Sequence, residues 1–277
     1  MGGMENLWTR GRRYLARRIA PPEATPAASP EPVAEPSFRE RLDSDELPRM
    51  QYAYPLYHAA LQARRLDIPR ITAIEFGVFT GHGLRDLEYL AGEIEREIGG
   101  IAIDVVGFDS GQGMPAPVDY RDMAYVWQKG FFCIDLPAVK SQLRRSEIVI
   151  GDVGDTVHEF VKREPAPIGF ISFDLDYYSS TMKAFELLGY PTQRFLPRVL
   201  SYFDDVAGDD FELHCEYTAE LLAIREFNEQ HEMRKICPIH LLRNKRRSPA
   251  GWNEHIYVAH FFDHPLYNRY INTDKNW

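Results

Sequence analysis

Cysteine is scarce in this sequence, and the few thiols form no pattern. The chain of 277 residues holds three cysteines, Cys133, Cys215 and Cys237. An odd number of widely spaced thiols argues against a disulfide framework, and their spacing does not match a zinc site. We therefore expect the protein to work in a reducing compartment, the cytoplasm.

Long apolar runs and an excess of basic residues are also lacking. No stretch reaches the ~18 apolar residues of a membrane helix, and the N-terminus lacks the apolar core of a secretory signal. The formal net charge of −9 argues against nucleic acid as the main partner. None of the nine histidines has a metal-ligand spacing to another.

The composition divides the chain into a basic arm over residues 1–20, a linker over 21–36 and a single domain over 37–277. The arm can lie as a helix on an anionic membrane surface or form a frayed or partner-docked segment, and Gly11 favours the second interpretation. The linker is rich in Pro, Ala and Glu and cannot form a packed core. The final residues, 268–277, are aromatic and polar, which suggests a subunit interface in a homo-oligomer.

An aromatic cluster stands near the start of the domain, where we expect helices over residues 37–66. Two interpretations are open for these helices: they pack onto a sheet, or they form an aromatic lid over a pocket. We take an N-terminal helical lid as the prediction for this segment. The cluster consists of Tyr52, Tyr54, Tyr57 and His58.

From residue 71 onward, short apolar runs alternate with segments of helical spacing. This alternation is typical of a doubly wound α/β sheet, in which helices cover both faces. The expected strands are 71–76, 103–110, 147–150, 168–173, 199–203, 236–242 and 255–262, and the expected helices among them are 84–98, 139–143, 156–162, 181–188 and 217–230.

Acidic residues stand at the carboxyl ends of the expected strands. Ligands of a doubly wound sheet bind outside these ends, and acids scattered over a surface would not follow the strand ends so regularly. We therefore expect one pocket at this edge of the sheet. The acids are Asp109, Asp152, Asp174, Asp204 and Asp205.

A glycine-rich turn connects the first expected strand to the helix that follows it. Gly77, Gly81 and Gly83 allow a sharp turn and let a ligand approach the backbone, and free N–H groups at a helix start suit negative charge. Short-chain dehydrogenases use the same glycine pattern, but they also need a Tyr-x-x-x-Lys pair. The only such pair in this sequence, Tyr125 and Lys129, falls in the loop after the second strand, too early to face a nicotinamide.

Three acids near this turn fit a nucleoside ligand. Glu75 precedes the first glycine and is placed to act on a ligand, and the two oxygens of Asp109 can accept both ribose hydroxyls. Asp152 can accept a hydrogen bond from an adenine amino group. The trio suits S-adenosylmethionine at least as well as a dinucleotide.

A second group of acids indicates a metal and a base. Neighbouring strands lie ~4.8 Å apart, so Asp174 is expected to face Asp204 and Asp205 across the sheet edge. Three carboxylates this close repel one another, and a hard divalent cation such as Mg²⁺ is their natural occupant, although aspartate also caps helices. If the chain stays extended, Asp176 points the same way as Asp174 and can act as general base toward an acceptor hydroxyl.

Four short sequence motifs, which follow one another along the chain, resemble those of the macrocin O-methyltransferase family. Members of this family are Mg²⁺-dependent enzymes that methylate sugar hydroxyls on glycosylated natural products. The resemblance covers roughly residues 71–206, and its second and third motifs are the more specific ones. The motifs are Glu75-x-Gly77-Val-x-x-Gly81, Gly-Phe-Asp109-Ser-x-x-Gly113-Met-Pro115, Phe173-Asp174-x-Asp176-x-Tyr178-x-Ser-Thr181 and Asp204-Asp205.

The resemblance implies a Rossmann-like class I methyltransferase with a seven-stranded, mostly parallel sheet whose last strand is antiparallel. It implies S-adenosylmethionine, a divalent cation, and a sugar hydroxyl of a small glycoside or a glycan as acceptor. Asp176 is the implied base, and the implied metal ligands are Asp174, Asp204 and Asp205. The implied cofactor-binding residues are Glu75, Gly77, Thr80, Gly81, Asp109, Ser110, Asp152 and Asp174.

Two further alternatives stay open. Catechol O-methyltransferases also place metal-binding acids after the fourth and fifth strands, but they have Lys three residues after the first metal aspartate, where this sequence has Tyr177. A glycan-binding protein without catalytic activity is the other alternative, and the intact set of aspartates after these two strands argues against it.

Overall fold

The computed structural model describes residues 35–272, and its compact unit begins at Pro36. The expected basic arm, the linker up to residue 34 and the last five residues of the tail lie outside the described residues. Helix α1, Phe38–Asp43, opens the unit. Ser37 begins it with a capping box, because its side chain accepts from the Glu40 N–H while the Glu40 carboxylate accepts from the Ser37 N–H at 2.8 Å.

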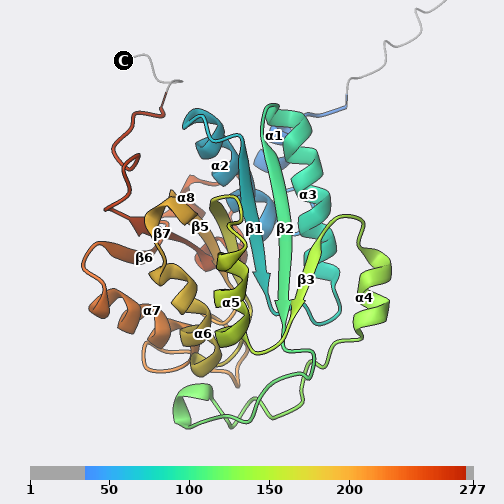
Figure 1. Ribbon diagram of the computed structural model, residues 1–277, viewed down its shortest axis with the longest axis vertical. Helices are drawn as coiled ribbons and strands as arrows, with labels where there is room; N and C mark the ends of the chain where they lie inside the picture. Colours follow the sequence, from blue (N-terminus) through green and yellow to red (C-terminus); the bar gives the residue numbers. More distant parts are fainter. Residues whose placement is uncertain (1–34, 273–277) are drawn as a thin grey trace, which may run out of the picture. The chain divides into compact units, whose positions relative to one another are not determined.

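One sheet of seven strands organises this unit (Figure 1), and the strand order is β3-β2-β1-β4-β5-β7-β6. Strand β7 is antiparallel to both of its neighbours, β5 and β6, whereas the other pairs are parallel. The prediction of a doubly wound, mostly parallel sheet with an antiparallel last strand is confirmed. The strands are β1 Arg70–Phe76, β2 Ala102–Asp109, β3 Glu147–Ile150, β4 Ile168–Phe173, β5 Phe195–Phe203, β6 Arg234–Pro238 and β7 Ile256–Phe261.

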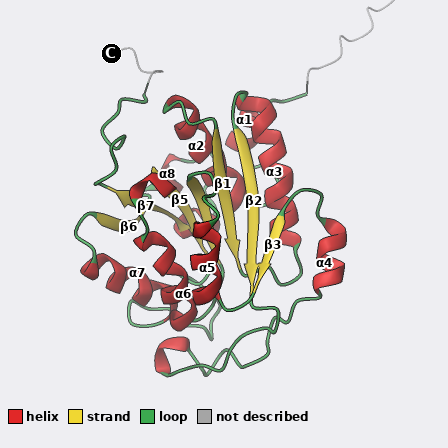
Figure 2. Cartoon of the chain, viewed as in Figure 1, coloured by secondary structure: helices red, strands yellow, loops and turns green. Residues whose placement is uncertain are grey.

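Helices cover both faces of the sheet (Figure 2). Ile71 and Ala73 of β1 point into the core shared with α1, α2 and α3, whereas Ile74 and Phe76 point into the core shared with α5, α6 and α7. Successive side chains of a strand alternate between the two faces, so a strand buried on both faces is apolar throughout. The helices after α1 are α2 Met50–Arg65, α3 His82–Ile98, α4 Leu136–Gln142, α5 Val153–Lys162, α6 Tyr178–Phe185, α7 Ala219–Gln230 and α8 Leu242–Lys245.

A ladder of phenylalanine rings joins the carboxyl ends of the central strands. Phe173 of β4 stacks on Phe76 of β1, with ring centroids 5.5 Å apart, and on Phe203 of β5 at 4.6 Å. Offset stacking of aromatic rings stabilises a pair by about 0.5–1.5 kcal/mol beyond the burial of its area. The ladder therefore fixes the strand ends that hold the expected site.

Several element boundaries differ from those expected. Strand β5 begins at Phe195 rather than at residue 199, and its pairing with β4 changes register around Pro197, which has no N–H to donate. Strand β6 ends at Pro238 because the chain turns through a left-handed Leu241, with φ of 59°, into the short helix α8. The helix expected over 181–188 begins earlier, at Tyr178, and continues as a 3₁₀ turn over Glu186–Gly189.

No helix between residues 35 and 272 is both long and apolar enough to cross a membrane. The three cysteines are free thiols, two of them exposed and Cys237 half-buried.

Candidate functional site

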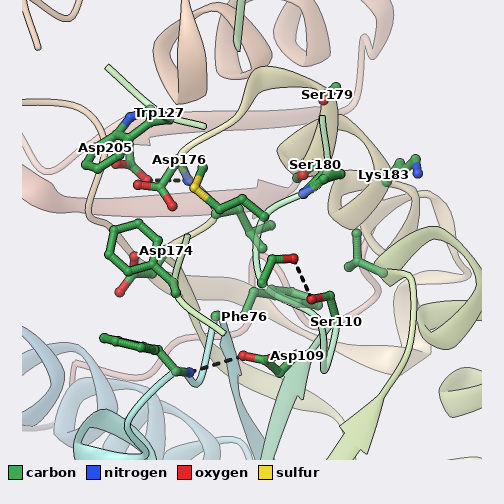
Figure 3. Close-up of a pocket in the computed structure, with 18 of the residues that line it drawn as sticks. Phe76, Asp109, Ser110, Trp127, Asp174, Asp176, Ser179, Ser180, Lys183 and Asp205 are labelled. Carbon is green, nitrogen blue, oxygen red and sulfur yellow. Dashed lines mark hydrogen bonds between the residues drawn. The ribbon is translucent and has the colours of Figure 1, made fainter. Parts of the chain in front are cut away.

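A cavity of about 710 Å³ lies at the carboxyl ends of β1 to β5 (Figure 3). The residues that follow each of these five strands contribute to its walls. Glu75 lies beneath the cavity, whereas Thr80 and Gly81 do not line it. Eight of the predicted site residues line the cavity: Gly77, Asp109, Ser110, Asp152, Asp174, Asp176, Asp204 and Asp205.

The turn after β1 is pressed against the end of β4. Gly77 has a φ of +86°, and a Cβ on it would lie 2.0 Å from the backbone oxygen of Asp174. Gly81, at the start of α3, has a φ of +76°, and a Cβ there would lie 2.6 Å from Val139 Cγ1. Both positions therefore require glycine for packing as well as for backbone conformation.

Asp109 at the end of β2 holds this turn in place. Its Oδ2 accepts hydrogen bonds from the backbone N–H groups of Val78 and Phe79 at 3.2 and 3.1 Å, and its Oδ1 accepts from Gly111 at 2.8 Å. We expected this carboxylate to accept two ribose hydroxyls. It already uses three of its roughly four acceptor positions, so its role toward a ribose stays a prediction.

Asp152 also has protein partners. It is the N-cap of α5, where its Oδ1 accepts from the Gly154 N–H at 2.9 Å, and its Oδ2 accepts from Lys183 Nζ at 2.8 Å. The hydrogen bond from Lys183 lowers the pKa of the Asp152 carboxyl below its usual value. Its expected contact with an adenine amino group is untested, and Lys183 is a cavity residue that the sequence pattern did not reveal.

Ser110 and Thr80 differ in their distance from the cavity. Ser110 lines it, and its hydroxyl donates to the Gly113 carbonyl at 2.8 Å, which closes the turn after β2. Thr80 is exposed on the glycine turn, where its carbonyl oxygen accepts from Gln142 at 3.5 Å. A cofactor contact by either residue stays a prediction.

Glu75 belongs to a buried network beneath the cavity. Tyr52 of α2 donates to Glu75 Oε1 at 2.7 Å and accepts from the Ser172 hydroxyl of β4 at 2.9 Å. Glu75 Oε2 has no partner among the described residues, and burial raises the pKa of this carboxyl to about 8. The first turn of α3 lies on the carboxylate, since a Cβ on Gly83 would be 1.9 Å from Oε1.

This network changes the interpretation of the aromatic cluster. Tyr52 is buried and supports the site from below, and α2 packs on β4 and β5. Among the described residues, none from 37–66 lines the cavity. In this structure α2 therefore covers the sheet, and the role of the segment as a lid stays a prediction.

The expected group of acids does gather at the ends of β4 and β5. The two strands pair in parallel with Phe173 opposite Phe203, so Asp174 and Asp204 follow at neighbouring positions. The Asp204 N–H donates to the Phe173 carbonyl at 3.0 Å. Burial, together with the charges of Asp204 and Asp205, raises the pKa of Asp174 well above its usual value.

Asp176 reaches the cavity by a different path from the one expected. Its φ is +57°, so the chain does not stay extended after Asp174 but turns sharply before α6. Its backbone N–H donates to Asp205 Oδ2 at 2.7 Å, and Figure 3 shows the Asp176 carboxylate beside Asp205. Burial and the neighbouring Asp174 raise the pKa of Asp176 to about 8. A left-handed residue that is not glycine costs about 1–3 kcal/mol and is often found at a functional site.

The expected metal ligands are close together but are not arranged around an ion. Among residues 35–272, no three His, Cys, Asp or Glu side chains form a group that could hold a metal ion. The Asp204 carboxylate accepts from the Tyr202 hydroxyl, and the Asp205 N–H donates to Glu220 Oε2 at 2.9 Å. Glu220 is fully buried in α7, its Oε1 has no hydrogen-bond partner within residues 35–272, and nothing in the sequence pattern singled it out.

A second buried acid, Asp122, fastens the long loop after β2 to the site. Its carboxylate accepts from the Val118 N–H at 2.8 Å, the Ser179 N–H at 2.8 Å and the Ser179 hydroxyl at 2.9 Å. Ser179 lies in the first turn of α6, three residues after Asp176. Asp122 therefore ties the loop to the helix whose start carries the expected base.

Comparison with known proteins finds similarity to solved structures. No protein-family profile matches the chain, and no curated protein matches it. Among solved structures, the chain is similar to the calicheamicin methyltransferase CalS11, with a TM-score of 0.53 and 24% identity over 79% of this chain and 82% of that one. This chain has a Rossmann-like methyltransferase fold.

Two other solved structures share a weaker likeness. An apo structure of CalS11, described as a TDP-rhamnose 3′-O-methyltransferase, has a TM-score of 0.45 and 22% identity over 79% of this chain and 83% of that one. The O-methyltransferase NovP has a TM-score of 0.42 and 15% identity over 56% of this chain and 65% of that one.

We expect Gly77→Ala to destabilise the protein by at least ~2 kcal/mol in chemical denaturation. A left-handed residue with a side chain costs ~1–2 kcal/mol, and the clash with the Asp174 carbonyl adds to this cost. The matched control is Gly92→Ala in α3, because a Cβ there meets nothing within 4 Å and alanine favours a helix interior by ~1 kcal/mol. Equal stabilities of the two variants would contradict this account of the turn.

Proposed function

We propose that the protein is an S-adenosylmethionine-dependent O-methyltransferase that acts on a sugar hydroxyl. The observation that supports this most is the position of Asp176, a buried acid in a sharp left-handed turn on the wall of a cavity whose other end is the glycine turn with Asp109. The fold supports the same proposal, as does the resemblance to the macrocin O-methyltransferase family.

The proposed chemistry uses the two ends of the cavity. S-adenosylmethionine would lie along the glycine turn and Asp109, with the acceptor near Asp176 (Figure 3). Asp176 would take the proton of the acceptor hydroxyl, while the hydroxyl oxygen forms a bond to the methyl carbon. The bond from that carbon to the sulfonium sulfur breaks with its electron pair, which leaves a neutral thioether. Such a transfer depends mainly on in-line positioning, which the rigid strand ends supply.

A divalent cation is part of the proposal. The carboxylates of Asp174, Asp204 and Asp205 are hard oxygen ligands of the type that Mg²⁺ prefers, and they would hold the cation only after their side chains turn toward one another, since the described residues contain no preformed group of three ligands. Asp204 is exposed, so its carboxylate is accessible at the cavity wall. When bound, the cation would lower the pKa of a coordinated acceptor hydroxyl.

The alternatives have weaker support in the described residues. For an oxidoreductase, Tyr125 would have to face a nicotinamide, but it is exposed and donates to the Glu212 carbonyl at 2.6 Å. For a catechol-type enzyme, a lysine is needed where Tyr177 is fully buried. A glycan-binding protein without activity would not need a buried carboxyl such as that of Asp176 on its cavity wall, because burying an acid costs free energy.

Calorimetric titration tests the choice of cofactor. We expect S-adenosylhomocysteine to bind and NADH to give no binding heat, because Tyr125 of the Tyr-x-x-x-Lys pair does not line the cavity. Each titration is run with and without Mg²⁺. Binding of NADH alone would mean that the glycine turn serves a dinucleotide.

Asp176→Asn tests the base. The amide cannot accept the hydroxyl proton, so we expect turnover to fall by about 10²–10⁴-fold. The affinity for S-adenosylhomocysteine, measured by calorimetry, should change little, because the residue lies at the acceptor end. Asp155→Asn on α5, outside the cavity wall, is the control. Wild-type turnover in Asp176→Asn would exclude this residue as the base.

The cation proposal has a readout that does not depend on turnover. Mn²⁺ binding, followed by electron paramagnetic resonance, should weaken by at least about tenfold in Asp204→Asn and stay unchanged in Asp209→Asn, which lies nearby in the same loop and outside the cavity wall. EDTA should abolish turnover of the wild type. Full activity in EDTA, or equal Mn²⁺ binding by the two variants, would contradict a metal at this site.

A further inference from the structure

The loop that follows β2 forms one wall of the cavity, and its two ends are joined to each other. The Met114 N–H donates to the Phe131 carbonyl at 2.8 Å, and the Gly130 N–H donates to the Met114 carbonyl at 2.9 Å. A Cβ on Gly113 would lie 2.4 Å from the Phe131 oxygen, so the ends of the loop are in close contact. A surface loop whose ends meet in this way is a compact element and is frequently functional.

Two further contacts fasten the loop to other parts of the cavity wall. Buried Asp122 accepts from the N–H and the hydroxyl of Ser179 at the start of α6. The Tyr125 hydroxyl donates to the carbonyl of Glu212 in the loop after β5, at 2.6 Å. The residues between Tyr125 and the closed ends of the loop are therefore held in place on both sides.

Trp127 lies in this held segment. Its backbone N–H donates to the Met123 carbonyl at 3.3 Å, and Met123 is a buried residue in a left-handed turn with a φ of 50°. The Trp127 side chain lines the cavity and packs against Phe132, with ring centroids 5.6 Å apart. Both the backbone and a neighbouring ring thus fix the position of the indole.

One polar atom of this indole lacks a partner. Trp127 Nε1 is buried and has no hydrogen-bond partner in the part of the chain that the structure describes. Figure 3 shows the ring beside Asp176 and Asp205, yet neither carboxylate accepts from it. A buried N–H without an acceptor is costly, and an oxygen of a bound molecule is its natural partner.

The position of the indole indicates which molecule supplies that oxygen. In Figure 3 Trp127 lies with Asp176 at one end of the cavity, whereas Asp109 and Ser110 lie at the other end. The cofactor is proposed to lie along the glycine turn and Asp109, and the acceptor near Asp176. The oxygen that faces Trp127 therefore belongs to the acceptor.

We propose that Trp127 determines specificity for the acceptor, because its Nε1–H donates a hydrogen bond to an acceptor oxygen other than the one that is methylated. The inference rests on the proposed function and adds a recognition residue to it. The indole N–H can only donate, so it pairs with a lone pair of a neighbouring hydroxyl or of the ring oxygen. An acceptor without that oxygen leaves the donor buried and unpaired, and a site of this kind rejects such an analogue.

The indole resonances of the full-length protein test the contact directly. The chain has four tryptophans, and the Trp127 signal in a proton–nitrogen correlation spectrum is identified by its loss in Trp127→Phe. The probes are methyl hexosides and methyl 6-deoxyhexosides, added with Mg²⁺ after S-adenosylhomocysteine. We expect the Trp127 signal to move downfield when a glycoside binds and to move much less with S-adenosylhomocysteine alone.

Analogues of the bound glycoside that each lack one oxygen identify the partner of the indole. Loss of that oxygen should weaken binding to the wild type by about three- to tenfold. Trp127→Phe keeps a ring beside Phe132 and should bind the parent glycoside about three- to tenfold more weakly, with no further loss for that one analogue. In turnover, the KM for the glycoside should rise in this variant while kcat stays nearly unchanged.

Trp252→Phe is the matched control. Trp252 packs against Tyr54, with ring centroids 5.7 Å apart, and does not line the cavity. This variant should bind every glycoside as the wild type does, and both variants should keep the wild-type affinity for S-adenosylhomocysteine. If Trp127→Phe does not fold, benzothienylalanine at position 127, in which sulfur replaces the N–H, carries the same expectations.

Equal binding of every probe by the wild type and Trp127→Phe would overturn the inference. So would a Trp127 signal that moves as far with S-adenosylhomocysteine alone as with a glycoside, or a wild type that binds none of the probes. Any of these results with S-adenosylhomocysteine still bound would leave the methyltransferase proposal in place. A protein that binds a glycoside through Trp127 but does not bind S-adenosylhomocysteine would support the contact and contradict the methyltransferase proposal.

Discussion

Repulsion among buried carboxylates at the ends of β4 and β5 is the constraint on which the rest of the site depends. Asp176, Asp205 and Glu220 are all buried, and Asp174 lies among them. Burial and mutual repulsion raise the pKa values of Asp174, Asp176, Asp205 and Glu220, and the surrounding structure holds the four carboxyls together against that repulsion. The phenylalanine ladder and the backbone hydrogen bonds between the strand ends supply that rigidity.

The same repulsion explains why several of these acids accept hydrogen bonds from backbone N–H groups. Asp205 accepts from the Asp176 N–H, and Asp122 accepts from two backbone N–H groups across two segments. These bonds connect the loops to the start of α6 and to the end of β5. The start of α6 and the loop after β2 are connected through Asp122, so both are held at the same wall of the cavity.

Much of the fold could be predicted because its signals are local. Strands buried on both faces, such as 168–173, are apolar runs between turn residues, and their bounds agree with the structure. The element ends were less predictable where a single residue redirects the chain, as Leu241 does after β6. Asp176 was predicted to lie at the cavity as part of an extended segment. In the structure it lies at the cavity in a left-handed turn, and a left-handed aspartate has no signature in the sequence.

The sequence by itself determined the order of strands and helices, the glycine turn and the presence of an acid after each central strand, because periodicity and local backbone preference decide these features. Only the tertiary structure decided what each acid contacts. Asp109 holds the glycine turn, Asp152 caps α5, and Glu75 bonds to Tyr52, 23 residues away. Tyr52 in turn bonds to Ser172, 120 residues further along the chain. Such partners are set by packing across the sheet, and no local pattern encodes them.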